Sequence, residues 1–323
     1  MSWIRKTTDG AFETAELIVG GIIPIGLIII GTIGNLLCVN YLLQRKTRQT
    51  RSAYIYLIFL CLSDTLSLYQ WNFDYIVMII GNRKSLTVKS LFLCRSIAFL
   101  SFYTLHLSAI FLTFVSIDRT LAIWSRTYRF HLTKRRRASI IALIVMMILF
   151  IIDGFLLSFG IINNDTNEII CYRSCNNKLM NFYENIYPMI HLIIMYIIPF
   201  VIMILGMILI LIKVFSHRFE SRHSRRKQHL LFMLVGMCLI YMILTLPNRL
   251  CFSVFLSRLL NHIYTDTVLL SSNTLLYTRN ATNILFLYMS SNKFRKYLAN
   301  ICCFTCRWST TSRVLPTQLV QMI

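Results

Sequence analysis

The sequence predicts an all-α membrane protein: a seven-transmembrane helix bundle with a short amphipathic helix after the seventh span. Of its 323 residues, 56% are hydrophobic and 14% are charged, whereas a soluble domain has about 25% charged residues. The apolar residues also gather in separate runs that are long enough to cross a hydrocarbon core of about 30 Å. We therefore expect one helical bundle inside a bilayer.

Six apolar windows have spanning length: 17–43, 54–80, 91–124, 138–162, 183–215 and 229–256. A seventh window, 267–290, is more polar, because it contains Ser271, Ser272, Asn273, Arg279, Asn280 and Asn283. A polar segment of this length is stable in a membrane when its polar face lies inside a bundle. We count it as a span, so that the bundle covers residues 17–290.

The formal net charge is +21, and the basic residues stand in short blocks between spans, at 45–51, 134–137, 222–227 and 293–296. Blocks of this kind orient a membrane protein and contact anionic lipids, so we expect no nucleic-acid partner. In a bundle of seven spans, all four blocks fall on the same side of the membrane as the C-terminus. The positive-inside rule then places residues 1–16 outside the cell and the tail, 301–323, in the cytoplasm. No cleaved signal peptide is evident, so the first span is expected to direct insertion.

The third window carries a cysteine near one end and an Asp-Arg pair near the other. The 25 or so positions from Cys94 to Arg119 span roughly 37 Å of helix, so the two sites lie on opposite membrane faces. Cys94 is then on the oxidising face, where a disulfide can form. Asp118 and Arg119 are on the cytoplasmic face.

Every span except the fourth contains a short motif: Gly34-Asn35-Leu36-Leu37, Leu62-Ser63-Asp64, Cys94 with Asp118-Arg119-Thr120, Ile198-Pro199-Phe200, Leu246-Pro247, and Asn283 followed by Phe294-Arg295. In this order and spacing, the chain resembles a rhodopsin-like (class A) G-protein-coupled receptor over about residues 17–300. The resemblance implies a multi-pass plasma-membrane receptor that binds an extracellular ligand and activates a heterotrimeric G protein, with arrestin as a further partner. It implies no enzymatic activity, no cofactor and no metal.

The resemblance also implies a disulfide between Cys94 and the loop that joins the fourth and fifth spans. Cys171 is the favoured partner, because it follows the strand-like residues 168–170, and Cys175 is the alternative. In the same loop, Asn164 begins an Asn-x-Thr glycosylation sequon.

The resemblance assigns G-protein coupling to Asp118, Arg119 and Thr120. An arginine at this depth is costly unless it is paired, so we expect Asp118 to hold Arg119 in the resting state. Thr120 stands where the family has an aromatic residue.

A second polar group is expected in the interior of the bundle: Asn35, Asp64, Ser108, Arg279 and Asn283. In the family, the positions of Asp64 and Ser108 help to hold a sodium ion. Arg279 lies one helical turn before Asn283, at about the depth of Asp64. We therefore hypothesise that an Arg279–Asp64 ion pair replaces the bound sodium.

Several positions depart from the family. Thr245 replaces a tryptophan, Met207 replaces a tyrosine, and no proline follows Asn283, so the usual kink must be missing or supplied by Ser and Asn side chains. These departures sustain an alternative function, a degenerate seven-helix scaffold that does not signal.

The candidates for the ligand pocket are Asp74, Ser101, His191, Asn248, Arg249 and Tyr277. Amine receptors carry an aspartate at the position of Ser101, so an amine ligand is disfavoured. Asp74 suits a cation and Arg249 an anion or carbonyl, unless the two neutralise one another or a neighbour. Residues 51–66 loosely resemble invertebrate FMRFamide-type neuropeptide receptors. We therefore expect a peptide ligand, with a non-peptide small molecule as the alternative.

Residues 291–300 have the pattern of an amphipathic helix on the membrane surface. Cys302, Cys303 and Cys306 follow beside basic residues, which makes them candidates for palmitoylation. The Ser and Thr residues at 305–312 are candidate phosphorylation sites for recruiting arrestin.

Overall fold

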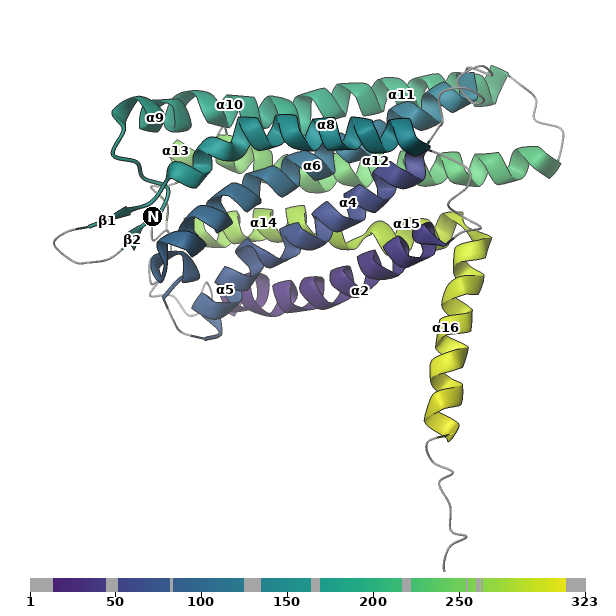
Figure 1. Ribbon diagram of the computed structural model, residues 1–323, viewed down its shortest axis with the longest axis horizontal. Helices are drawn as coiled ribbons and strands as arrows, with labels where there is room; N and C mark the ends of the chain where they lie inside the picture. The colour runs from purple at the N-terminus through teal and green to yellow at the C-terminus, as the bar shows by residue number, and fades with distance from the viewer. Residues whose placement is uncertain are drawn as a thin grey trace, which may run out of the picture.

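The computed structural model describes residues 14–44, 52–81, 84–124, 135–163, 169–216, 222–253, 255–259, 262 and 264–311. Six helical stretches in these ranges are long and apolar enough to cross a membrane. The predicted class, a transmembrane helix bundle, is confirmed (Figure 1).

The first two spans are η1 (Leu17–Ile22) with α2 (Ile23–Leu43), and α4 (Ser52–Tyr69) with α5 (Trp71–Ile79). The third and fourth are α6 (Leu91–Trp124) and α8 (Arg135–Asp153), the latter continued by η3 (Gly154–Ser158). The fifth is built from α9 (Asn177–Asn181), η4 (Phe182–Ile186), α10 (Tyr187–Leu192), η5 (Ile193–Ile197) and α11 (Ile198–Ser216). The sixth is α12 (Arg222–Ser253), and the seventh is α14 (Thr265–Ala281) with α15 (Asn283–Ser290).

The shorter elements lie between the spans or after them. They are η2 (Leu86–Val88), β1 (Ile161–Ile162), β2 (Ile169–Ile170), α13 (Leu256–Leu259) and, after the bundle, α16 (Asn292–Thr311).

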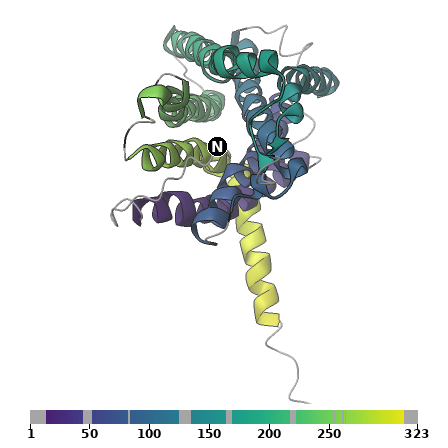
Figure 2. The ribbon, with the colours of Figure 1, turned by 90° about the vertical axis from the view of Figure 1, so that its left-hand side faces the viewer.

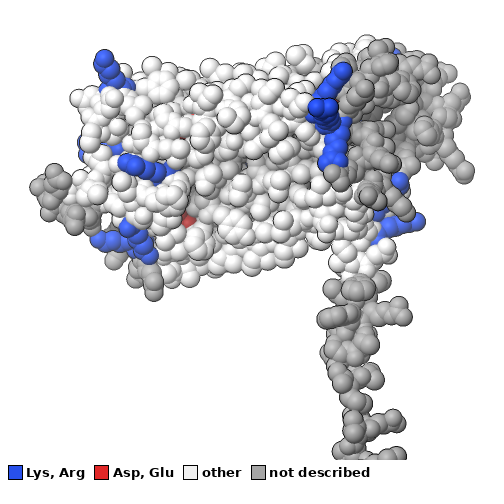
Figure 3. Space-filling model, viewed as in Figure 1, with Lys and Arg blue, Asp and Glu red and all other residues white. Residues whose placement is uncertain are grey.

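Helix α6 is the central helix of the bundle, since it packs against α4, α8 and α11. Helices α14 and α15 pack between α2 and α12, which closes the bundle on the other side (Figure 2). The seventh helix is too polar to count as a span by its composition alone. Its packing explains how it fits in a membrane, because its polar side chains face other helices. On the face shown in Figure 3, Lys and Arg lie at the two ends of the bundle and almost no charge lies between them.

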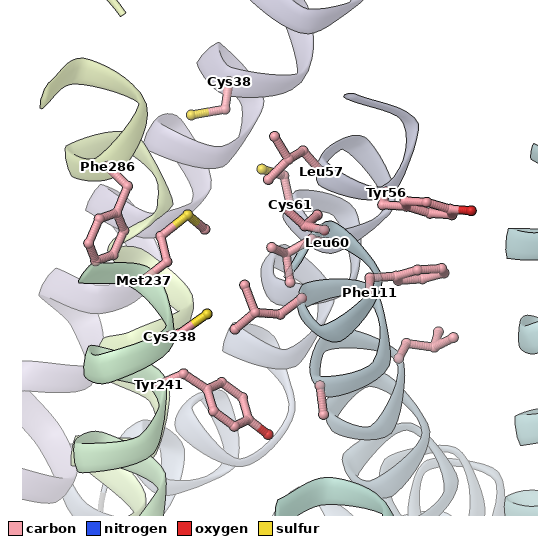
Figure 4. Packing of buried hydrophobic residues seen from close by; sticks show 14 of the residues in the cluster. Cys38, Tyr56, Leu57, Leu60, Cys61, Phe111, Met237, Cys238, Tyr241 and Phe286 are labelled. Carbon is pink, nitrogen blue, oxygen red and sulfur yellow. The ribbon is translucent and has the colours of Figure 1, made fainter. Parts of the chain in front are cut away.

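The apolar core lies between the helices along much of the bundle, including the Arg119 half. Side chains from α2, α4, α6, α12 and α15 interdigitate there, among them Cys38, Leu57, Leu60, Cys61, Phe111, Met237, Cys238, Tyr241 and Phe286 (Figure 4). Two glycines allow α2 to approach closely. A Cβ at Gly31 would lie 2.4 Å from Leu68 Cδ1, and one at Gly34 would lie 2.9 Å from Ile284 Cγ2. A side chain at either position would push α2 away from its neighbours.

The seventh helix is interrupted at Thr282, between α14 and α15. The Thr282 hydroxyl donates to the Arg279 carbonyl at 2.7 Å, and this hydroxyl-to-backbone bond competes with the helical ladder. The interruption stands at a threonine between Asn280 and Asn283, where we had expected Ser and Asn side chains to replace the missing proline. It orients Asn283 at the start of α15.

Helix α16 leaves the bundle at a steep angle, as an element on the membrane surface would (Figure 1). It begins at Asn292, near the predicted start, but it continues to Thr311, well beyond the predicted end at residue 300. Its first turns are anchored by Phe294, which is fully buried with its ring centroid 5.0 Å from that of Tyr41 on α2. The helix is therefore longer than predicted.

Candidate functional site

The loop between the fourth and fifth spans is tied to α6 by a disulfide. Cys94 and Cys171 are bonded, with 5.7 Å between their Cα atoms, which confirms the favoured pairing. Strands β1 and β2 pair antiparallel and bring Cys171 to α6, in agreement with the predicted strand-like segment. The alternative partner, Cys175, is free and exposed. Asn164 lies outside the described residues.

The residue after the disulfide covers the mouth of the bundle. Tyr172 has a φ of 60°, and its ring stacks on Trp71 of α5 at 5.9 Å between centroids. Burial raises the pKa of the Tyr172 hydroxyl well above its ordinary value, and the neighbouring Tyr183 adds to the shift. The loop therefore places a neutral aromatic side chain over the interior.

Asp74 contacts the loop between α5 and α6. Its carboxylate accepts hydrogen bonds from the Ser85 hydroxyl at 2.7 Å and from the Leu86 backbone N–H at 2.6 Å. Among the described residues, no ion pair joins Asp74 to Arg249, so the mutual neutralisation that we considered does not occur. Ser101 is buried and donates to the Ile97 carbonyl of its own helix at 2.6 Å.

The other pocket candidates lie together in the half of the bundle that contains Cys94. Asn248 donates to Asn273 Oδ1 at 2.6 Å, and Asn273 donates to the Tyr75 hydroxyl at 3.3 Å, which links α12, α14 and α5. Arg249 contacts both Asn248 and His191. Tyr277 is almost fully buried on α14.

His191 belongs to a buried polar group that we did not predict. Its Nδ1 lies 2.7 Å from His106 Nε2, and His106 Nδ1 lies 2.9 Å from Asp153 Oδ2. Tyr187 donates to the other oxygen of Asp153 at 2.8 Å. The signal was present in the sequence, because an acid inside an apolar span is a functional candidate by default.

The five residues predicted to form the internal polar cluster are all brought together. Asn283 donates to Asp64 Oδ2 at 2.6 Å and to Asn35 Oδ1 at 3.0 Å. Ser108 donates to Asp64 Oδ1 and accepts from Arg279 Nη1 at 2.8 Å. Arg279 Nη2 lies 3.4 Å from Asp64 Oδ1, as the ion-pair hypothesis requires.

Arg279 also has partners beyond Asp64. Its guanidinium carbon lies 4.9 Å from the centre of the Tyr241 ring, and it donates to Asn280, which in turn donates to Ser67. A buried arginine is thus held by an anion, an aromatic face and an amide. Arg279 on α14 thus connects α4, α6 and α12, and Asn283 on α15 connects the cluster to α2.

At the other end of α6, Arg119 is held by contacts with two helices. Its Nε lies 3.9 Å from Asp118 Oδ2, and its guanidinium carbon lies 5.7 Å from the centre of the Tyr54 ring on α4. Asp118 is buried and accepts a hydrogen bond from the Ser52 hydroxyl. Thr120 donates to the Ser116 carbonyl of its own helix at 2.9 Å, and it is buried.

The three candidate palmitoylation sites, Cys302, Cys303 and Cys306, fall in the second half of α16. Their backbone is helical, and their side chains lie outside the described part of the chain.

Two comparisons with known proteins bear on identity. A search among curated proteins finds no match. A comparison with protein-family models matches residues 34–306 to the 7 transmembrane receptor (rhodopsin family). The match covers most of the chain and includes the internal polar cluster, the Cys94–Cys171 disulfide and the Asp118-Arg119 pair. This chain therefore belongs to the rhodopsin family of seven-transmembrane receptors.

Proposed function

We propose that this receptor binds an extracellular neuropeptide and activates a heterotrimeric G protein, with its N-terminus outside the cell. The observation that carries the proposal is the state of Arg119, which is held by Asp118 and Tyr54 at one end of α6. An arginine held in this way can be released when the helix ends separate. The freed guanidinium then forms part of a contact surface for a Gα subunit.

The peptide ligand is supported by the opposite end of the bundle. The aromatic side chains of Trp71 and Tyr172 and the polar side chains of Asn248 and Arg249 lie there, under a loop that is fixed by a disulfide. Aromatic and polar groups in one mouth suit the mixed chemistry of a short peptide. Residues 51–66, with their loose likeness to FMRFamide-type receptors, favour the same class.

The test is nucleotide exchange on a panel of Gα subunits, with the purified receptor and a neuropeptide library. At least one peptide is expected to accelerate exchange, and Arg119→Ala is expected to abolish the acceleration. Arg136→Ala is the matched control, because Arg136 is an exposed arginine at the start of α8 and should not affect coupling. Activation by an amine, lipid or nucleoside alone would overturn the peptide assignment.

A second candidate function is a non-signalling scaffold. Thr245 favours it, because it is fully buried, it replaces a bulky switch residue, and among the described residues no group bonds to its hydroxyl. If no ligand of any class activates any Gα subunit, this function is preferred.

A further inference from the structure

Four buried side chains form a continuous chain of hydrogen bonds across the Cys94 half of the bundle. We call Asp153, His106, His191 and Arg249 the relay; each is less than a tenth exposed. Its links are Asp153 Oδ2 to His106 Nδ1 at 2.9 Å, His106 Nε2 to His191 Nδ1 at 2.7 Å, and His191 Nε2 to Arg249 Nη1. The relay therefore joins α8, α6, α10 and α12 in sequence.

The charged ends of the relay determine where its protons lie. A guanidinium can only donate, so His191 Nε2 must accept from Arg249 and the His191 proton must be on Nδ1. That proton is donated to His106 Nε2, which leaves the His106 proton on Nδ1, facing the Asp153 carboxylate. Both imidazoles are consequently neutral, and a cation and an anion are connected through two neutral rings.

Arg249 has no anion in direct contact. Its described hydrogen-bond partners, His191 and Asn248, are both neutral, and no described group accepts from its Nε–H. Arg249 is only 4% exposed, so this unused donor is not compensated by bulk water. A buried guanidinium in this state favours a negatively charged partner strongly.

We propose that Arg249 binds an anionic group of the ligand, a carboxylate being the class that fits its planar fork, and that this binding takes up one proton. The inference rests on the proposed function, a receptor for an extracellular ligand. A carboxylate that takes the place of His191 Nε2 as the acceptor from Arg249 Nη1 leaves that nitrogen without a donor. The vacated nitrogen then takes a proton from solvent, and the ligand carboxylate balances the new charge. The proton returns to solvent when the ligand leaves.

Other titratable groups face the relay and stay the same throughout. Tyr103 on α6 and Tyr187 on α10 lie beside Asp153, and Tyr241, Tyr277 and Arg279 lie on the side of Arg249. A tyrosine hydroxyl, with an ordinary pKa of about 10, is neutral over the physiological range. His191 is thus the group whose protonation changes with the state of Arg249.

The experiment uses the purified full-length receptor and two probes of the same shape, N-acetyl-phenylalanine and N-acetyl-phenylalaninamide. Only the first carries a carboxylate, which is ionised at both about pH 6 and about pH 8. Apparent Kd values come from the dependence of the melting temperature on probe concentration. The acid is expected to bind about tenfold or more tightly than the amide. Its affinity should rise by up to about tenfold per unit of falling pH, the limit for one linked proton.

Variants separate the two parts of the inference. Arg249→Gln should remove the preference for the acid, while His191→Gln should keep that preference and lose its pH dependence. Arg95→Gln is the matched control: Arg95 lies on α6 near the disulfide, donates to the Phe159 carbonyl, and should leave both properties intact. The melting temperature without probe verifies that each variant is folded.

Three outcomes overturn the inference. The first is equal affinity of acid and amide for the unmodified receptor, or no binding of either at millimolar concentration. The second is a preference for the acid that survives Arg249→Gln. The third is an affinity for the acid that does not change with pH. None of these outcomes affects the proposed function, because the measurement involves no G protein. Conversely, a receptor that binds the acid in this way but never accelerates nucleotide exchange would overturn the proposed function and leave this inference intact.

Discussion

Arg279 places a fixed positive charge in the middle of the bundle, 3.4 Å from Asp64. A sodium ion at Asp64 would have to share the carboxylate with this guanidinium, and the repulsion between two cations in a low-dielectric interior disfavours it. Ser108 donates to Asp64 and accepts from Arg279, so its hydroxyl already has partners. The polar cluster is thus complete without an added cation.

We predict that sodium does not stabilise the unmodified receptor, whereas Arg279→Asn gains a sodium response. Its melting temperature should be higher in sodium chloride than in choline chloride, and adding Asp64→Asn should remove the difference. Arg279→Asn alone is also expected to cost about 3–5 kcal/mol in choline chloride, because it leaves Asp64 buried without its cation. Stabilisation of the unmodified receptor by sodium would contradict the hypothesis.

At the other end of α6, Ser52 contributes to holding Asp118 and, through it, Arg119. Ser52→Ala removes a hydrogen bond to a buried carboxylate, which is worth about 1.5–3 kcal/mol. If Asp118 holds Arg119 in the resting state, basal nucleotide exchange should rise about tenfold or more. Ser63→Ala is the control, since Ser63 is a buried serine of the same helix that donates to its own backbone at Leu60. An unchanged basal rate in Ser52→Ala would count against the resting role of this contact.

The seventh helix shows what sequence can predict about an element. The sequence showed that 267–290 is polar and has no proline after Asn283, and this segment forms α14 and α15. The position of the interruption could not be predicted, because the bond from Thr282 to the Arg279 carbonyl forms only once the helix exists. A rule for proline predicts a kink, but hydroxyl side chains bond locally in many conformations.

Helix α16 is the element that we expect to attach to the membrane surface. Phe294 and Tyr297 pack against Tyr41, while Lys293, Arg295 and Lys296 are exposed, which gives the first turns an apolar and a basic face. We predict that Cys302, Cys303 and Cys306 are palmitoylated and that replacing all three by serine abolishes capture of the receptor on a thioester-reactive resin. Cys175→Ser, an exposed cysteine at the opposite end of the bundle, should leave capture unchanged. Undiminished capture of the triple variant would exclude this modification.

On the scale of the whole molecule, the spans followed from hydropathy, whereas the contacts between them followed only in part. The internal cluster was predictable because four of its members sit at family positions and Arg279 lies one helical turn before Asn283. The relay was not, because His106 and His191 meet only when α6 and α10 adopt particular rotations. The partners of Asp74 were not predictable for a similar reason: Ser85 and Leu86 lie in a loop whose path the sequence does not define.

Two independent properties of the whole molecule indicate the same orientation. The Cys94–Cys171 disulfide forms only on an oxidising face of the membrane. The sequence, with a net charge of +21 and short basic blocks between spans, predicts these blocks on the other face. We therefore predict that an epitope tag at the N-terminus is accessible to antibody on intact cells. A tag at the C-terminus should be accessible only after permeabilisation. Cys175→Ser should not alter this pattern, while Cys171→Ser should lower the amount of folded receptor at the surface, since it removes a crosslink between residues 77 positions apart. A C-terminal tag that is accessible on intact cells would reverse the orientation and make the cysteine face cytoplasmic, where this disulfide would not persist.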